Sequence, residues 1–199
     1  MQLIETIRTC NRRLENIKWH NERFNKSRQE LFGETEKIDL RNIINIPLSL
    51  PRTVHKCRVV YDKKIIKSEF IAYQAKRVRT IGLITDNEIE YNFKYTDRSC
   101  LHSLLAKSRA DEIIIVKNNF ITDASYANVC FFDGEKWWTP ANPLLAGTMR
   151  SKLIFQQKIY PTDIRPSDLR LFKKVKLINA MLVFENTPAL DIEKISNSD

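Results

Sequence analysis

The first part of the chain combines strand-like and helical patterns of apolar residues. Residues 3–8 form a short strand-like run, and Ile17, Phe24 and Leu31 then recur at helical spacing. Gly33 follows at the position expected of a C-cap, which predicts a helix over residues 14–31. A shorter helix over residues 37–44 and strands over residues 56–61 and 65–73, joined by a polar turn, complete a small α+β lobe that we assign to residues 1–74.

The second part is richer in strands. Residues 73–79 are basic with little apolar pattern, which indicates a link between lobes, and strands are predicted over residues 80–85, 174–178 and 182–184. The run Ile113–Ile115 is typical of a central strand buried on both faces. Asp133–Gly134 between two aromatic pairs predicts a hairpin, and helices are expected over residues 98–108 and from Thr148. These elements make a larger, β-rich lobe over residues 75–199.

Composition limits the function more than it defines it. The hydrophobic share of 43% and charged share of 29% are ordinary for a globular protein. The net charge of +9 suits either nucleic acid or a cleft for a small polyanion, but the basic residues are dispersed and form no nucleic-acid motif. No membrane-length apolar run, signal peptide or metal-ligand cluster is evident, so we expect a cytoplasmic protein without metal, bound to neither membrane nor nucleic acid. The scattered cysteines fit reduced thiols: Cys10, Cys57, Cys100 and Cys130.

Lys94 is the first candidate for chemistry. It lies between a strand and a helix and is flanked by Phe93 and Tyr95. A lysine in an apolar setting tends to have a lowered pKa, which suits Schiff-base chemistry. In a lysine-rich chain, the alternative of a solvated lysine stays open at this point.

An acid and a helix start follow in order. Asp123 ends an apolar run and precedes Ser125 and Asn128, where an isolated Thr-Asp pair would more often be a turn or cap. The pair Gly147-Thr148 begins a helix, whose free N–H groups and dipole favour a phosphate, although Gly-Thr at a helix start is usually only an N-cap.

The first predicted helix carries polar residues on or beside its apolar stripe. His20 lies on the stripe and Arg23 at its edge. A bidentate arginine suits phosphate, and an arginine that reaches solvent is the alternative. We expect His20 to be packed and hydrogen-bonded rather than catalytic.

Together these windows resemble the class IV (fold-type IV) family of pyridoxal-phosphate enzymes. The resemblance implies a two-lobed fold like that of D-amino acid aminotransferase, with pyridoxal 5′-phosphate as cofactor. It implies that Lys94 is the Schiff-base lysine and proton shuttle, that Asp123 binds the ring nitrogen, and that Arg23 clamps the phosphate. The remaining implied cofactor contacts are Gly147, backbone N–H groups of Thr148 and Met149, and Asn179, while Asn128 braces the loop.

Within that family the chain is most similar to the aminodeoxychorismate lyases. Lys94 is followed by Asp97 and Arg98 at the spacing of the lyases' Asn and Arg, and Asn179 stands where other members have Ser or Thr. The resemblance therefore implies conversion of 4-amino-4-deoxychorismate to 4-aminobenzoate and pyruvate, with a small anionic substrate and a homodimer. Thr6 and Arg8 match the early strand that can face the substrate.

Several departures from the family pattern keep alternatives open. Asp123 replaces the usual Glu, Met149 falls at the family's Thr position, and most members are longer before the Glu-Thr-Ile-Arg run. The lyases' substrate-binding arginine has three candidate counterparts, Arg58, Arg77 and Arg79. A transaminase for branched-chain or D-amino acids is the first alternative, and a degenerate, non-catalytic binding protein is the second.

Overall fold

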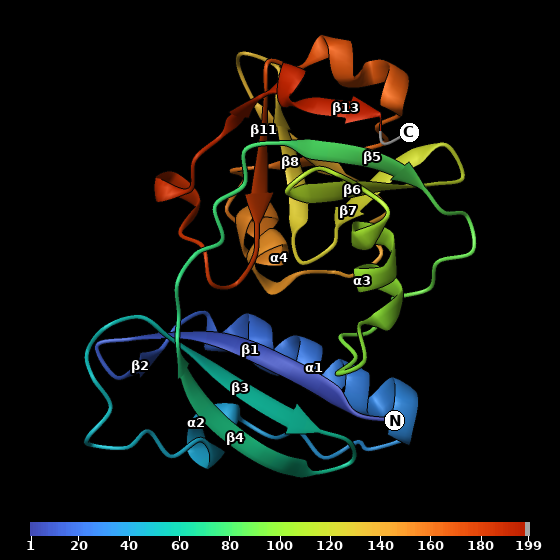
Figure 1. Cartoon of the computed structure of the whole chain (residues 1–199). Coiled ribbons are helices and arrows are strands. Elements are labelled where there is room, and N and C mark those ends of the chain that lie inside the picture. The colour runs from blue at the N-terminus through green and yellow to red at the C-terminus, as the bar shows by residue number, and fades with distance from the viewer. Residues whose placement is uncertain (198–199) are drawn as a thin grey trace. The chain divides into compact units, whose positions relative to one another are not determined.

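A computed structural model describes residues 1–197, and the chain divides into two compact units (Figure 1). The first comprises Met1–Ala75 and Phe93–Asp97, and the second comprises Lys76–Asn92 and the chain from Arg98 onward. Each unit mixes helices with a sheet. No helix in the described range has the length and apolar character needed to cross a bilayer.

The first unit is a four-stranded antiparallel sheet packed against one long helix (Figure 1). Side chains of one sheet face and of the helix share a core that includes Leu3, Ile7, Phe24, Val59 and Tyr61. In sheet order the strands are β2 (Arg13–Leu14), β1 (Leu3–Cys10), β3 (His55–Tyr61) and β4 (Ile65–Ala72), and the helices are α1 (Ile17–Phe32) and α2 (Leu40–Ile43).

The ends of α1 show how local sequence sets an element. Gly33 adopts the left-handed conformation (φ 72°) and its N–H donates to the last-turn carbonyls, so the predicted C-cap is confirmed. The helix begins at Ile17 rather than near Leu14. The reason is that Arg13 and Leu14 pair with Cys10 and Thr9 as β2.

The segment that carries Lys94 belongs to the first unit. Tyr95 bridges Leu3 at the edge of β1, and the Ile4 N–H donates to the Lys94 carbonyl over 2.9 Å. These backbone contacts correct the expectation that the lysine lies in the larger lobe. Sequence order suggested that lobe, but pairing with β1 decides the matter.

The second unit is built on a nine-stranded sheet with a central strand that is buried along most of its length. Along its main path the strands are β10 (Tyr160–Thr162), β9 (Trp137–Pro140), β8 (Asn128–Phe132), β7 (Phe120–Ala124), β6 (Glu112–Lys117), β5 (Ile81–Thr85) and β13 (Ile195–Asn197). β11 (Lys174–Ile178) pairs with β8 and with β12 (Leu190–Asp191). Its α-helices are α3 (Ser99–Ala106) and α4 (Thr148–Phe155), and its 3-10 helices are Pro166–Leu171, Phe184–Asn186 and Ile192–Lys194.

Two local predictions in this unit have opposite outcomes. The hairpin at Asp133–Gly134 is confirmed, since β8 and β9 are antiparallel and the Asp133 N–H donates to the Lys136 carbonyl. The strand predicted over residues 182–184 is wrong. The Val183 carbonyl accepts from the Asn186 and Thr187 N–H groups and from the Thr187 hydroxyl. The chain therefore forms a 3-10 helix here instead of pairing as a strand.

Candidate active site

A buried charge cluster joins β1 to α1 in the first unit. The Glu5 side chain is fully buried and accepts from Arg23 Nε (2.8 Å) and Nη2 (2.7 Å). His20 Nδ1 lies 2.6 Å from Glu5 Oε2. Burial alone would raise the pKa of Glu5, but Arg23 and His20 outweigh it and hold the pKa at about 2. Burial lowers the pKa of His20, so a neutral imidazole donates from Nδ1 to an ionised Glu5.

This cluster fixes the predicted phosphate arginine in place. Arg23 forms a bidentate pair with Glu5, and only 14% of its side chain is exposed. Its contact with a phosphate stays a prediction. Sequence reasoning missed Glu5, although the strand register gave a signal: Glu5 lies between Leu3 and Ile7 on the face that turns toward the helix.

Lys94 is half-buried on the segment that pairs with β1. Its backbone is held beside Glu5, because its carbonyl accepts from Ile4. Its ammonium charge is also among the influences that lower the pKa of His20. The Glu5–His20–Arg23 cluster and the Lys94 segment therefore belong to one local arrangement in the first unit.

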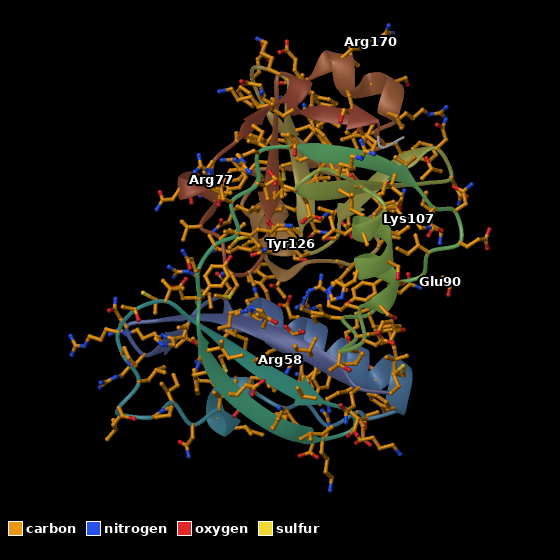
Figure 2. All side chains as sticks on the ribbon, viewed as in Figure 1. Arg58, Arg77, Glu90, Lys107, Tyr126 and Arg170 are labelled. Carbon is orange, nitrogen blue, oxygen red and sulfur yellow. The ribbon has the colours of Figure 1, made fainter. Side chains whose placement is uncertain are left out.

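Three of the four arginines considered for substrate carboxylates already pair with an acidic side chain. Thr6 and Arg8 lie on the half-buried face of β1, and Arg8 forms an ion pair with Glu15. Arg58, on β3 in Figure 2, pairs with Glu69 over 3.0 Å. Arg79 pairs with Asp111 over 3.6 Å, and Arg77 is exposed. None of these four arginines is buried, and three of them are paired, so none stands out as the group that binds a substrate carboxylate.

Asp123 is the focus of the second unit's candidate residues. It lies on β7 opposite Asn128 of β8, and it is 5% exposed. Asn128 Nδ2 donates to Oδ1 over 2.6 Å and the Leu145 N–H donates to Oδ2 over 2.8 Å. Burial raises the pKa of Asp123 to about 7, although these donors and the Arg150 charge oppose the shift. In the part of the chain that the structure describes, Asp123 has no ion-pair partner.

Asn128 links this carboxylate to the start of α4. Its Nδ2 also donates to the Leu145 carbonyl over 2.8 Å, and its Oδ1 would lie 1.9 Å from a Cβ placed on Gly147. The close approach that requires glycine is thus to Asn128. Asn128 braces this loop as expected, whereas the approach of Gly147 to an anion stays a prediction.

The start of α4 places backbone N–H groups next to this network. Gly147 is the N-cap, so its own side chain cannot cap the helix, and Thr148 and Met149 are buried in the first turn. Asn179, which follows β11, uses its Oδ1 to accept from the Met181 N–H over 2.9 Å. Asp123, Asn128 and Gly147 are therefore brought together, and Asn179 braces its own turn.

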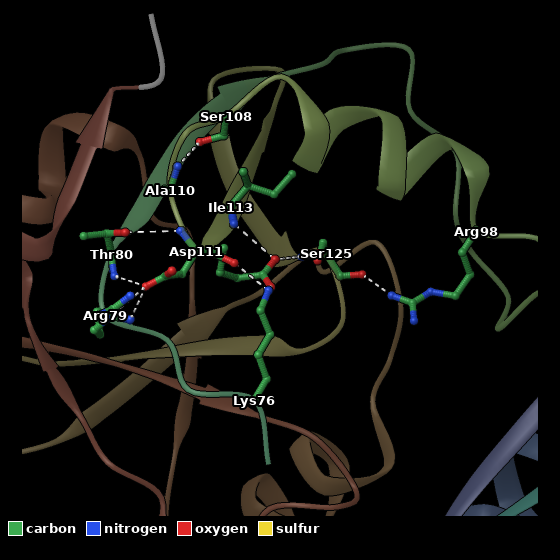
Figure 3. A network of polar contacts seen from close by, with 10 residues as sticks. Lys76, Arg79, Thr80, Arg98, Ser108, Ala110, Asp111, Ile113 and Ser125 are labelled. Carbon is green, nitrogen blue, oxygen red and sulfur yellow. Dashed lines mark hydrogen bonds and ion pairs between the residues drawn. The ribbon is translucent and has the colours of Figure 1, made fainter. Parts of the chain in front are cut away.

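A second buried acid, which sequence reasoning missed, holds the turn after Asp123. Glu112 is fully buried and accepts from the Ser125 N–H over 3.0 Å. Lys76 pairs with Glu112 over 3.0 Å, and Arg98 donates to the Ser125 carbonyl over 2.6 Å (Figure 3). The Lys76 ammonium also lies over the Tyr126 ring. The turn at Ser125 is therefore held at its N–H by Glu112 and at its carbonyl by Arg98. An acid at the start of an apolar strand was the available signal.

The fold and these residue groups together define a class: a mixed α/β protein with a half-buried lysine, a buried acid and a helix start in the chain order of fold-type IV enzymes. The family described as amino-transferase class IV matches residues 90–185, a range that includes Lys94, Asp123 and Gly147.

Individual relatives agree with this assignment. An uncharacterized protein of Haemophilus influenzae is 37% identical over 90% of this chain and 97% of its own length. A crystal structure from Haemophilus somnus, provisionally named 4-amino-4-deoxychorismate lyase, is 33% identical, with a TM-score of 0.84 over 90% of this chain and 96% of that one. A provisionally named amino-acid aminotransferase from Mesorhizobium loti shares the fold at 17% identity, with a TM-score of 0.79 over 98% and 99% of the two chains. The chain belongs to the class IV aminotransferase family, and it spans nearly the whole of these relatives.

Proposed function

We propose that this protein is a pyridoxal-phosphate-dependent lyase that converts 4-amino-4-deoxychorismate to 4-aminobenzoate and pyruvate. The observation that carries the cofactor assignment is the state of Asp123. Its carboxylate is buried, its pKa is raised to about 7, and no cation pairs with it among residues 1–197. A protonated pyridine nitrogen would supply the missing positive charge, and the carboxylate would keep that nitrogen protonated.

The residues present fit the cofactor's other groups. The first-turn N–H groups of Thr148 and Met149 and the guanidinium of Arg23 are suitable phosphate donors. Asp123 reaches less far than the family's Glu, but its carboxylate orientation is set by Asn128 and Leu145. When bound, pyridoxal phosphate supplies an electron sink for a carbanion next to the substrate nitrogen.

The chain's own residues supply attachment, proton transfer and charge. The ε-amine of Lys94 would hold the cofactor covalently, yield to the substrate amine, and then move the ring proton. Glu5 would fix the conformation of the Arg23 side chain, because the bidentate pair leaves the guanidinium little freedom. Glu112 and Arg98 would keep the turn after Asp123 from shifting.

The lyase is favoured over a transaminase by two features. Lys94 is followed by Asp97 and Arg98, and Asn179 stands at the position where other class IV members have Ser or Thr. The 33% identity to a structure provisionally named as the lyase also supports it. A class IV transaminase for branched-chain or D-amino acids is the second candidate, supported by the Mesorhizobium loti fold. We also propose a homodimer, which sedimentation would check.

The first experiment tests the cofactor and the lysine. Purified protein is incubated with pyridoxal phosphate, its visible spectrum is recorded, and borohydride reduction is followed by peptide mapping. We expect a Schiff-base band that borohydride fixes on Lys94. Lys94→Ala should lose the band, whereas Lys107→Ala, which removes an exposed lysine (Figure 2), should keep it. No adduct on Lys94 in the folded wild-type protein would favour the non-catalytic binding protein.

The second experiment separates the two reactions. The loaded protein is given 4-amino-4-deoxychorismate, and 4-aminobenzoate and pyruvate are measured together. Equal amounts of both products support the lyase. If amino acids alone convert the cofactor to its pyridoxamine form and no 4-aminobenzoate is made, the transaminase replaces it.

A further inference from the structure

A hollow of about 500 Å³ opens where the β1–β2 turn meets the loop before β3. None of its lining residues belongs to the candidate active site, and all lie in the first unit. Its size falls within the range of roughly 300–1,000 Å³ that is usual for small-molecule sites. It is lined by Cys10, Asn11, Arg12, Arg13, Glu15 and Arg52.

The charge around this hollow is one-sided. Three arginines line it against a single acid, Glu15, and that acid is engaged by Arg8. Within residues 1–197, the side chains of Arg13 and Arg52 make no hydrogen bond or ion pair. Three guanidinium groups around one space repel each other unless an anion lies between them. Guanidinium forks also match phosphate and carboxylate oxygens in pairs.

The arginines are held on a fixed rim. Asn11 and Arg12 both adopt left-handed backbone conformations (φ 50° and 57°) in the two-residue turn that joins Cys10 to its partner Arg13. The Asn11 N–H donates to the Arg52 carbonyl over 3.0 Å, which joins the turn to the loop before β3.

Arg12 is an unusual choice at its position. The second residue of such a turn strongly favours glycine, and a larger side chain there is strained. The Arg12 side chain is nevertheless retained and anchored, since its Nε donates to the Leu50 carbonyl over 2.8 Å. A residue that opposes local backbone preference is often kept for function.

We infer that this hollow, lined by Arg12, Arg13 and Arg52, binds a small multivalent anion that carries phosphate or several carboxylate groups. The inference does not depend on the proposed lyase reaction, because it uses no residue of that site. Arg13 and Arg52, whose side chains have no partner in the described part of the chain, and the anchored Arg12 supply the donors. The rim is preorganised, so little side-chain and loop ordering opposes binding.

Cys10 offers a local reporter, because its half-exposed thiol forms part of the wall. Cys57 and Cys130 are buried, so a Cys100→Ser background leaves Cys10 as the accessible thiol. The rate of its reaction with the dianionic reagent 5,5′-dithiobis(2-nitrobenzoate) is divided by the rate with the neutral reagent 4,4′-dithiodipyridine. In this ratio, differences in the exposure of the Cys10 thiol cancel, so it reports the electrostatic attraction of the dianionic reagent to the hollow.

Arg13→Ala/Arg52→Ala should lower that ratio about tenfold at low salt. The matched control, Arg41→Ala/Arg109→Ala, removes the same net charge from exposed arginines elsewhere and should leave the ratio nearly unchanged. Inorganic pyrophosphate and citrate are then tested as protectants of Cys10 and by calorimetry, which separates the phosphate from the carboxylate source. Protection by either, lost in the Arg13/Arg52 variant and retained in the control, supports the site.

Three results would overturn the inference. One is an equal ratio in both double variants. Another is no protection by either anion at millimolar concentration. The last is protection by a single-stranded oligonucleotide at concentrations where pyrophosphate has no effect, which would assign the arginines to nucleic acid instead.

Discussion

Replacing Gly147 by alanine tests the contact that joins Asn128 to the start of α4. The backbone of Gly147 (φ −69°, ψ 141°) suits any residue, so the substitution introduces no backbone strain. The new Cβ would instead lie 1.9 Å from Asn128 Oδ1 and 3.1 Å from its Cγ. Rotating the amide by a half-turn gives no relief, since its nitrogen would then occupy the same place.

The magnitude follows from the hydrogen bonds that Asn128 must give up. They are the 2.6 Å bond to Asp123 and the 2.8 Å bond to the Leu145 carbonyl. Losing a buried bond to a carboxyl and one to a carbonyl costs roughly 2–4 kcal/mol. The lower entropy of the unfolded chain returns roughly 0.4–1 kcal/mol. Gly147→Ala should therefore lower the free energy of unfolding by roughly 1–3 kcal/mol.

A double-mutant cycle with Asn128→Ala isolates this effect. Guanidinium denaturation is followed by tryptophan fluorescence, to which Trp137 and Trp138 of the same unit contribute. In the Asn128→Ala background the space for the Cβ is open, so adding Gly147→Ala should be neutral or slightly stabilising. An equal loss in both backgrounds, or no loss in the wild-type background, would show that the new Cβ does not clash with Asn128.

Three further predictions concern ionisable groups. The pKa of Asp123 rises from 3.8 to about 7, so its contribution to the stability of the cofactor-free protein is present below pH 4 and is lost as pH rises through 7. The free energy of unfolding should therefore fall by roughly 4 kcal/mol between those pH values, and Asp123→Asn should remove this fall when denaturation is measured across the range. The pKa of Glu5 falls to about 2, so its contribution is present above pH 4.5; Glu5→Gln should cost roughly 3–5 kcal/mol at pH 7, and the difference from wild type should shrink as pH falls through 2. Burial raises the pKa of Cys57 and Cys130 to about 12, so both should react with thiol reagents only on unfolding, whereas Cys100 reacts at once; equal rates for all three would contradict the fold.

Elements whose signals are local could be predicted from the amino-acid sequence. The C-cap at Gly33, the buried strand through Ile114 and the hairpin at Asp133 each depend on a few adjacent residues. Their backbone conformation and burial pattern follow from residue type and spacing alone. The order of the lysine, acid and helix-start windows was also readable, and it was enough to indicate the class IV family.

Which side chains contact one another became evident from the folded structure alone. Glu5 and Arg23 are 18 positions apart, and their pairing depends on the register of β1 against α1. Position 147 requires glycine because the Asn128 side chain, which comes from β8, occupies the place where a Cβ would lie. The Lys94 segment joins the first unit through a bridge to β1. Periodicity records which side of an element is buried, but partners are fixed by long-range packing, and for that reason the sequence did not show them.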